Sequence, residues 1–248
     1  MKYFAAILTC LCFISSSSHA KQLNIDSVSE NPIFAYFNKQ AKVNYIAFVG
    51  GEGLKGKASK SKNPVARSGK EFRDVGSNYF IFPNPAKKMK LSNADRNGGK
   101  DHMQRILNLI NYIKTQNSLP IVLLGHSRGS ISVSSAAKIL GKENVKGIVV
   151  LSSITSSYGD YTPYYLTMES MLKKVELPVL VVHHEKDACT VSQYNAAKKL
   201  AEKNNYKLIT ISGGGTTGSV CGPLHYHGFE GTAEEVIRAV QEWSTTLQ

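Results

Sequence analysis

Five residues, Gly125 to Gly129, read G-H-S-R-G and match the G-x-S-x-G pattern that places a nucleophilic serine on a tight turn. They follow an apolar run, Pro120 to Leu124, and precede a helix-like stretch, Ser130 to Leu140. The predicted order is strand, turn, helix, and the two glycines remove the Cβ atoms that would keep strand and helix apart. The turn would expose the Ser127 hydroxyl over the end of a sheet. The pentapeptide is also compatible with an ordinary serine-rich helix start. The assignment of Ser127 as a nucleophile therefore depends on whether the chain also supplies a base and an acid.

A serine hydroxyl is a poor nucleophile at neutral pH, so it needs an imidazole base and a carboxylate that orients the base. Asp187 stands shortly after a second apolar run, Pro178 to His183. His225 and His227 lie in the loop that follows a further run, Lys207 to Ser212. The candidate groups therefore occur in the order Ser, Asp, His.

This order and the context of the motif resemble the α/β-hydrolase superfamily, and within it compact bacterial esterases and dienelactone-hydrolase-like or serine-peptidase-like members. The resemblance extends from about residue 43 to residue 243. It implies that Ser127 is the nucleophile, Asp187 the acid and His227 the base of a catalytic triad. His227 is preferred to His225 because the base of the superfamily usually stands directly before a Gly-aromatic step, here Gly228-Phe229.

The resemblance also implies an oxyanion hole made of two backbone N–H groups. One belongs to Arg128, the residue after the nucleophile, and the other to the loop after the early strand Val43 to Val49. That loop reads G-G-E-G from residue 50 and lacks the leading histidine of the HGGG pattern. The second donor is Gly51 or Glu52.

The sequence also contains partial matches to two other kinds of site. Gly51 to Lys57 fits the phosphate-binding pattern G-x-x-x-x-G-K, but Ala58 stands where Ser or Thr should hold magnesium, and no helical pattern follows in residues 59–69. A metal site could draw on the histidines and the acid near the proposed triad. However, the chain has no HExxH motif, and adjacent strand residues such as His183 and His184 point to opposite faces. We therefore expect neither a cofactor nor a metal.

The N-terminus has the features of a secretory signal peptide: Lys2, an apolar segment from Tyr3 to Ile14, and the small-x-small sequence S-H-A ending at Ala20. We expect cleavage after Ala20, which leaves residues 21–248 as a single α/β-hydrolase domain of an exported, periplasmic or secreted protein. Cys189 and Cys221 are the two cysteines beyond this segment. In an oxidising compartment they predict a disulfide that joins the acid-bearing loop to the base-bearing loop.

The formal charge of the chain is +12 at pH 7, which indicates attraction to anionic surfaces. Seven basic residues lie between Lys55 and Arg73, in a stretch with Gly, Ser and Pro. This basic loop is predicted to be solvated and mobile, or to dock on anionic lipid, polysaccharide or nucleic acid. No nucleic-acid-binding motif supports the last of these partners.

Short, continuous apolar runs alternate with helical patterns, which predicts an α/β fold: a mostly parallel central sheet with helices on both faces. The predicted strands are 43–49, 78–82, 120–124, 146–151, 178–183 and 207–212, and the predicted helices are 100–114, 128–140, 191–203 and 233–245. Thr190 and Thr232, each three residues before Gln or Glu, predict capping boxes for the last two helices. Residues 152–176 are too few for a substantial lid, and their tyrosines are predicted to be half-buried or to form an aromatic wall facing the substrate.

These features predict an exported serine hydrolase that acts through an acyl-enzyme, on a small-molecule or lipid-like carboxylic ester. An amidase or peptidase is the alternative within the same chemistry. A catalytically silent binding protein of the cell envelope is the alternative from another class, because the oxyanion loop departs from the usual pattern.

Overall fold

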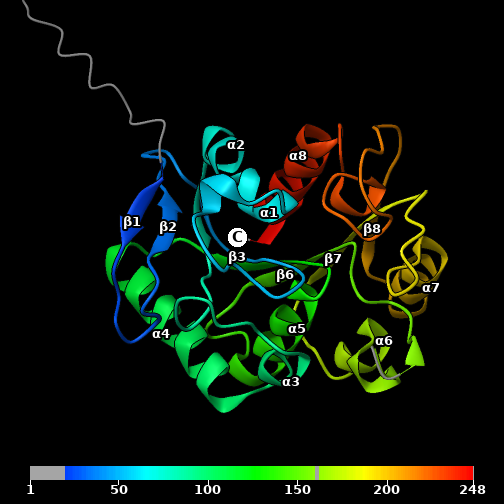
Figure 1. Cartoon of the computed structure of the whole chain (residues 1–248). Helices are drawn as coiled ribbons and strands as arrows, with labels where there is room; N and C mark the ends of the chain where they lie inside the picture. Colours follow the sequence, from blue (N-terminus) through cyan, green and yellow to red (C-terminus); the bar gives the residue numbers. More distant parts are fainter. Residues whose placement is uncertain (1–19, 160–161, 248) are drawn as a thin grey trace, which may run out of the picture.

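The computed structural model describes residues 20–159 and 162–247 (Figure 1). The predicted signal peptide lies outside these residues, apart from Ala20. In the described ranges, no helix has the length and apolar character needed to cross a membrane.

One sheet of eight strands forms the centre of the molecule, in the order β1-β2-β4-β3-β5-β6-β7-β8. The strands are β1 (Lys21–Leu23), β2 (Ile33–Tyr36), β3 (Val43–Phe48), β4 (Ser77–Ile81), β5 (Ile121–His126), β6 (Gly147–Leu151), β7 (Val179–His184) and β8 (Lys207–Ile211). The six neighbouring strands β4, β3, β5, β6, β7 and β8 are parallel. Strands β1 and β2 add an antiparallel edge next to β4. The six predicted strands are confirmed to within two residues at each end.

Eight helices of four residues or more lie in the described ranges, together with short 3-10 turns. They are α1 (Pro64–Arg67), α2 (Gly69–Asp74), α3 (Asn93–Arg96), α4 (Lys100–Gln116), α5 (Gly129–Leu140), α6 (Met168–Met171), α7 (Tyr194–Asn204) and α8 (Ala233–Ser244). Helices α1, α2 and α8 cover one face of the sheet, and α4, α5 and α7 cover the other (Figure 1). The predicted class, a mostly parallel sheet between two helical layers, is confirmed.

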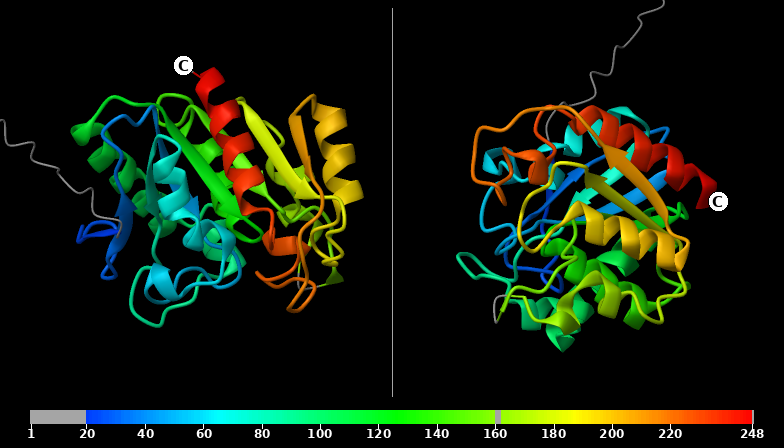
Figure 2. Two further views of the ribbon diagram at one scale, coloured as in Figure 1. Left: turned by 90° about the horizontal axis from the view of Figure 1, so that it is seen from above. Right: turned by 90° about the vertical axis from the view of Figure 1, so that its right-hand side faces the viewer.

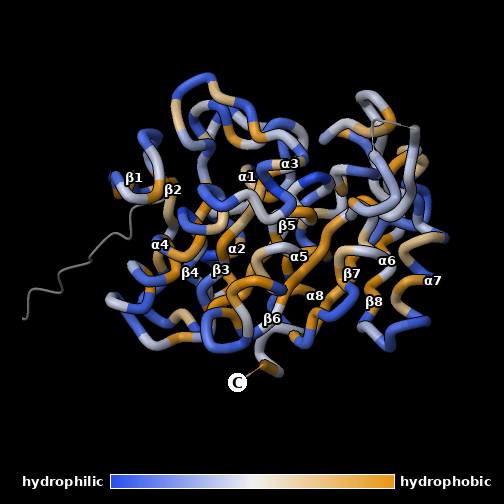
Figure 3. Tube along the Cα trace, turned by 90° about the horizontal axis from the view of Figure 1, so that it is seen from below, coloured by the Kyte–Doolittle hydropathy of each residue, from blue (hydrophilic) through white to orange (hydrophobic). Residues whose placement is uncertain are grey.

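Burial on both faces explains why the central strands are apolar along their whole length (Figure 3). Every residue of β3 and β5 is buried, and the residues of each strand divide between two separate cores. The register pairs Phe48 of β3 with Gly125 of β5 and His126 of β5 with Leu151 of β6. The carboxyl ends of these strands therefore lie side by side.

The prediction of a mobile basic loop is wrong for residues 64–73, which form α1 and α2. Asn63 caps α1 by accepting a hydrogen bond from Val65 N–H. Arg67 donates to the carbonyls of Pro223 and Gly228 and forms an ion pair with Glu230, so tertiary contacts hold the segment in place. Periodicity could not reveal this, because each helix is shorter than two turns.

Both predicted capping boxes are wrong. Helix α7 begins at Tyr194 rather than near residue 191, because hydrogen bonds from Cys189 N–H and the Ser192 hydroxyl to Asp187 keep the preceding residues in a turn. Thr232 is the N-cap of α8, but its hydroxyl makes no capping hydrogen bond.

The loops at the carboxyl ends of the parallel strands gather at one edge of the molecule (Figure 2, left, lower side). The segment between β6 and β7 contains a 3-10 turn and the four-residue helix α6 in its described part, which agrees with the prediction of no substantial lid. Tyr158, Tyr164 and Tyr165 are about 60% exposed, so the interpretation as half-buried tyrosines is wrong for these three. Tyr161 lies outside the described residues.

Candidate active site

Ser127 stands on the sharp turn between β5 and α5. Its φ is +52°, a left-handed conformation that is strained for a residue with a side chain. A Cβ on Gly129 would lie 2.1 Å from the carbonyl oxygen of Phe48, and one on Gly125 would lie 2.6 Å from that of Gly129. Both glycines are therefore required for the close approach of α5 to the sheet. The serine is partly exposed at the carboxyl edge.

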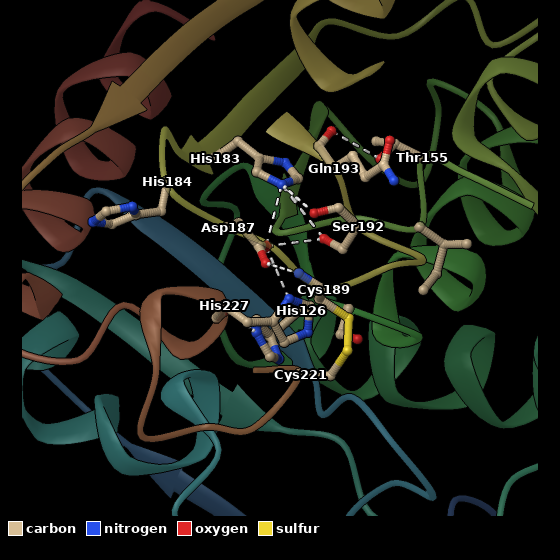
Figure 4. Close-up of polar contacts among 12 residues, drawn as sticks. His126, Thr155, His183, His184, Asp187, Cys189, Ser192, Gln193, Cys221 and His227 are labelled. Atoms are coloured by element: carbon tan, nitrogen blue, oxygen red, sulfur yellow. Dashed lines mark hydrogen bonds and ion pairs between the residues drawn. A yellow bond between two sulfur atoms is a disulfide. The ribbon is translucent and has the colours of Figure 1, made fainter. Parts of the chain in front are cut away.

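Asp187 and His227 meet beside His126, the residue before Ser127 (Figure 4). The Nδ1 of His227 donates to Oδ2 of Asp187 at 2.9 Å, and both side chains are almost completely buried. The carboxylate can only accept, so it fixes the His227 tautomer with the proton on Nδ1 and leaves Nε2 as a base. No hydrogen bond joins the Ser127 hydroxyl to His227 among the described residues, and such contacts often tighten only when substrate binds.

Two further side chains support Asp187. Oδ2 accepts from the Ser192 hydroxyl at 3.1 Å and lies 3.2 Å from Nε2 of His183, whose proton is shared with the Ser192 carbonyl oxygen at 3.0 Å (Figure 4). Burial raises the pKa of Asp187, but the hydrogen bonds from His183 and His227 outweigh this effect and hold it well below its ordinary value. The carboxylate therefore stays ionised, as the orienting acid of a base must. Glu185, the other acid nearby, is exposed.

His126 links the serine turn to the base-bearing loop. Its Nε2 lies 2.8 Å from the carbonyl oxygen of His227, which must accept, so Nε2 carries the proton. Its Nδ1 then accepts from the side-chain amide of Asn63 at 3.1 Å. Burial, followed by the neighbouring His227, lowers the pKa of His126 to about 3, so the ring is neutral at physiological pH.

The loop after β3 runs directly beside Ser127. A Cβ on Gly50 would lie only 3.0 Å from the Cβ of Ser127. The carbonyls of residues 49–52 all accept hydrogen bonds from the protein. In contrast, the N–H groups of Gly51, Glu52 and Arg128 have no acceptor among the described residues. The loop thus offers unpartnered donors beside the serine, and the contacts do not distinguish Gly51 from Glu52.

The buried side chain of Arg96 holds this loop in place, a role that the sequence did not predict. One nitrogen, Nη2, donates to the carbonyls of Val49 at 3.0 Å and Gly51 at 3.3 Å. The other, Nη1, donates to the Ser132 hydroxyl of α5 at 3.1 Å. Burial, followed by repulsion from Arg128, lowers the pKa of Arg96 to about 9, which still leaves it charged at neutral pH. A single buried guanidinium therefore fixes the loop after β3 relative to α5, the helix that follows the serine turn.

We expect Arg96→Lys to lower kcat for ester hydrolysis by ~10²-fold with little change in KM, because a displacement of ~1 Å in catalytic geometry costs about that much. A lysine amine cannot reproduce the planar fork that bridges two carbonyls and a hydroxyl. Steady-state kinetics and thermal unfolding should be measured together.

Arg105 provides the matched control for this prediction. It is also a buried arginine that donates to backbone carbonyls, those of Val28 and Pro83. Arg105→Lys should lower the melting temperature without the loss of kcat. Equal effects of the two substitutions on kcat would contradict a positioning role for Arg96.

Cys189 and Cys221 are joined by a disulfide in the structure, with their Cα atoms 4.7 Å apart (Figure 4). The bond connects the turn that carries Asp187 to the loop that carries His227. It closes a segment with a sequence separation of 32. In the chain-entropy model, a loop of this length stabilises the fold by roughly 3 to 4 kcal/mol.

Reduction should therefore lower the melting temperature by roughly 10 °C and reduce activity at the same time, since the acid and base loops lose their connection. Calorimetry and ester hydrolysis with and without reductant measure both effects. The double variant Cys189→Ser/Cys221→Ser should show the same losses and no response to reductant. Free thiols at both positions in the non-reduced protein, detected by mass spectrometry, would rule the bond out.

The remaining histidines near the site have structural contacts. His183 and His184 point to opposite sides of β7, and Nε2 of His184 lies 2.9 Å from the carbonyl oxygen of Gly213 while its ring stacks on Tyr226. His225 contacts the Tyr226 ring and does not reach Asp187. In the described part of the chain, no three His, Cys, Asp or Glu side chains are arranged to hold a metal ion.

No protein-family model matches the chain, and no curated protein matches its sequence. Solved structures match it in fold. An esterase from Pyrococcus furiosus has a TM-score of 0.62 at 15% identity, with 92% of each chain covered. A bromoperoxidase from Bacillus anthracis (TM-score 0.57, 14% identity) and an esterase from Exiguobacterium antarcticum (0.55, 13%) each cover 86% of this chain and 95% of their own.

The protein has the α/β-hydrolase fold, which confirms the resemblance inferred from the sequence at the level of the fold. At 12 to 15% identity, the likeness does not extend to the reaction. The reaction depends on the residues around Ser127 rather than on the fold.

Proposed function

We propose that the protein is an exported serine hydrolase that cleaves a carboxylic ester through an acyl-enzyme on Ser127. One observation carries the proposal: the buried Asp187–His227 pair lies next to a serine held at φ +52°, beside a loop with unpartnered N–H groups. These groups come from three distant parts of the chain. Their convergence supports the triad Ser127, Asp187, His227 and an oxyanion hole formed by the N–H group of Arg128 and that of Gly51 or Glu52.

The proposed reaction has two halves. In the first, Oγ of Ser127 attacks the ester carbonyl carbon while Nε2 of His227 takes the hydroxyl proton. The oxyanion of the tetrahedral intermediate accepts hydrogen bonds from the two N–H groups, and collapse expels the alcohol, which receives the proton from His227. In the second, His227 deprotonates a water molecule that attacks the acyl-enzyme, and Ser127 leaves with that proton. The carboxylic acid and the free enzyme result.

The choice of an ester and the export of the protein have separate support. Two of the three solved structures named above are esterases, which favours an ester over an amide. The Cys189–Cys221 disulfide is compatible with an oxidising compartment, where the signal-like N-terminus would direct the chain.

A fluorophosphonate probe tests the proposal, because it labels serines that are activated by a base. The protein without its first 20 residues should become labelled, and the modified peptide should contain Ser127. Prior heating of the protein should abolish the labelling, since a denatured serine is not activated. No labelling of the folded protein, or labelling at another residue, would contradict the proposal and favour a silent binding protein.

A further inference from the structure

Arg128 directly follows the candidate nucleophile in the chain, and no acid of the described ranges balances the charge of its side chain. Its Nε donates to Oδ1 of Asn93 at 2.7 Å, and Nη2 lies 3.5 Å from the carbonyl oxygen of Leu91. Within the described ranges, it forms no ion pair, and Nη1 has no partner. The guanidinium is thus held in place by neutral acceptors while one of its donor groups stays available.

The two loops next to Arg128 are strongly basic. The loop after β3, residues 52–63, and the loop after β4, residues 83–91, are held together by hydrogen bonds to the Glu52 carbonyl from Leu91 N–H and the Asn84 side chain. These 21 residues contain seven exposed lysines and one acid, Glu52, a formal charge of +6 out of +12 for the whole chain. The lysines are Lys55, Lys57, Lys60, Lys62, Lys87, Lys88 and Lys90. Half of the net charge is therefore concentrated beside the oxyanion loop.

The opposite half of the same edge carries little net charge, because Glu185 and Lys186, the exposed charged residues of the loop after β7, cancel each other. The loop after β8, residues 212–226, contains no Lys, Arg, Asp or Glu, and residues 152–168 contain only Asp160. This half instead exposes Tyr158, Tyr164 and Tyr165. In the sheet, β4 and β3 lie on one side of β5, and β6 to β8 lie on the other. Ser127, directly after β5, therefore stands at the boundary between a strongly basic surface and one with little net charge.

We propose that Arg128 and the lysines around it form an anion subsite, and that the substrate is an ester that carries a carboxylate or phosphate group close to its scissile carbonyl. An arginine fork matches both anions, and the lysines would draw them in from solution. Because Arg128 directly follows Ser127, the anionic group must lie within one side chain's reach of the reacting carbon. This inference rests on the proposed function and names its class of substrate.

A small anionic ester fits the basic loops better than a bilayer does. Membrane docking combines basic residues with apolar side chains that insert among the lipids. Met89 is the only large apolar side chain that these two loops expose. The fixed, half-buried position of Arg128 also suits a ligand that enters the site rather than a surface that covers it.

Two esters of equal length test the subsite: the 4-nitrophenyl monoester of glutaric acid, which has a free carboxylate, and 4-nitrophenyl valerate, which has a methyl group there. The wild-type protein should prefer the glutarate ester in kcat/KM by at least ~10-fold at low salt, and the preference should shrink as salt screens the charges. Arg128→Gln should reduce the ratio of kcat/KM for the glutarate ester to kcat/KM for the valerate ester by ~10-fold. This holds whatever the substitution does to each kcat/KM separately. Lys138→Gln, an equal charge change at the far, exposed end of α5, should leave the ratio unchanged.

A binding measurement separates this inference from the proposed function. Monomethyl glutarate should bind to Ser127→Ala in calorimetric titration, and the added Arg128→Gln should weaken binding at least ~10-fold. That result would support the subsite even if no ester were hydrolysed, in which case only the proposed function would fail. Turnover of both esters with a ratio near one would overturn the subsite and leave the hydrolase intact. A rate gain seen only with phosphatidylglycerol vesicles, and retained in Arg128→Gln, would assign the loops to a membrane and also overturn the subsite.

Discussion

Replacing Ser127 by alanine should lower kcat for ester hydrolysis by at least ~10³-fold, because nucleophile and base act as one unit and neither is useful alone. The fold should persist. The change removes one oxygen from a partly exposed side chain whose backbone bonds, to Leu151 and Ser130, involve only main-chain atoms of residue 127. Steady-state hydrolysis of a 4-nitrophenyl ester measures the loss, and circular dichroism with thermal unfolding verifies the fold.

Ser157 provides the control for this substitution. It is an exposed serine in the segment after β6, and none of the contacts of the candidate site involve it. Ser157→Ala should retain wild-type turnover and labelling by the fluorophosphonate probe. Wild-type turnover in a folded Ser127→Ala protein would remove Ser127 from the proposed role.

His227→Ala should be nearly as damaging as the loss of Ser127, with a decrease in kcat of ~10³-fold or more. Nε2 of His227 is the proposed proton acceptor, and its Nδ1 already bonds to Asp187 at 2.9 Å. Because His227 is buried, its removal leaves a cavity that free imidazole could enter. Added imidazole should therefore restore part of the activity, an effect that loss of stability alone would not produce.

His225→Ala is the matched comparison, two residues away in the same loop. Its ring lies against Tyr226 rather than Asp187, so we expect a loss of less than ~10-fold and no rescue by imidazole. A larger loss in His225→Ala than in His227→Ala would move the base to His225. Both variants should be compared at a temperature at which circular dichroism indicates that they are folded.

Local sequence signals identified the elements that position the site. Continuous apolar runs predicted the six parallel strands, because strands buried on both faces have no polar side to alternate with. The two glycines around Ser127 predicted the turn, and the structure shows that neither tolerates a Cβ. The resemblance implied Gly51 or Glu52 as the second oxyanion donor, and the N–H groups of both lack an acceptor among the described residues.

The supporting residues could not be found in this way. Asn63, His126, His183 and Arg96 act through partners 4 to 101 positions away in the chain, such as the His227 carbonyl that His126 contacts. No local pattern distinguishes these residues from ordinary polar ones. Helices α1 and α2 were not predicted because each is too short to show periodicity, and the contacts of Arg67 with the loop around Pro223 hold them in place.

The sequence by itself determined the parallel sheet, the serine turn after β5 and the order of the candidate groups, because backbone sterics and burial are encoded residue by residue. The sequence resemblance also favoured His227 over His225, and the structure agrees, since His227 bonds to Asp187. Tertiary structure alone decided which residues support Asp187 and the loop after β3, and that half of the net charge lies on one side of Ser127. Those properties depend on which strands the order of the sheet places side by side, and therefore on which loops meet at their carboxyl ends. Hydrogen bonds and charges act over a few ångströms in space, regardless of how many residues separate the partners in sequence.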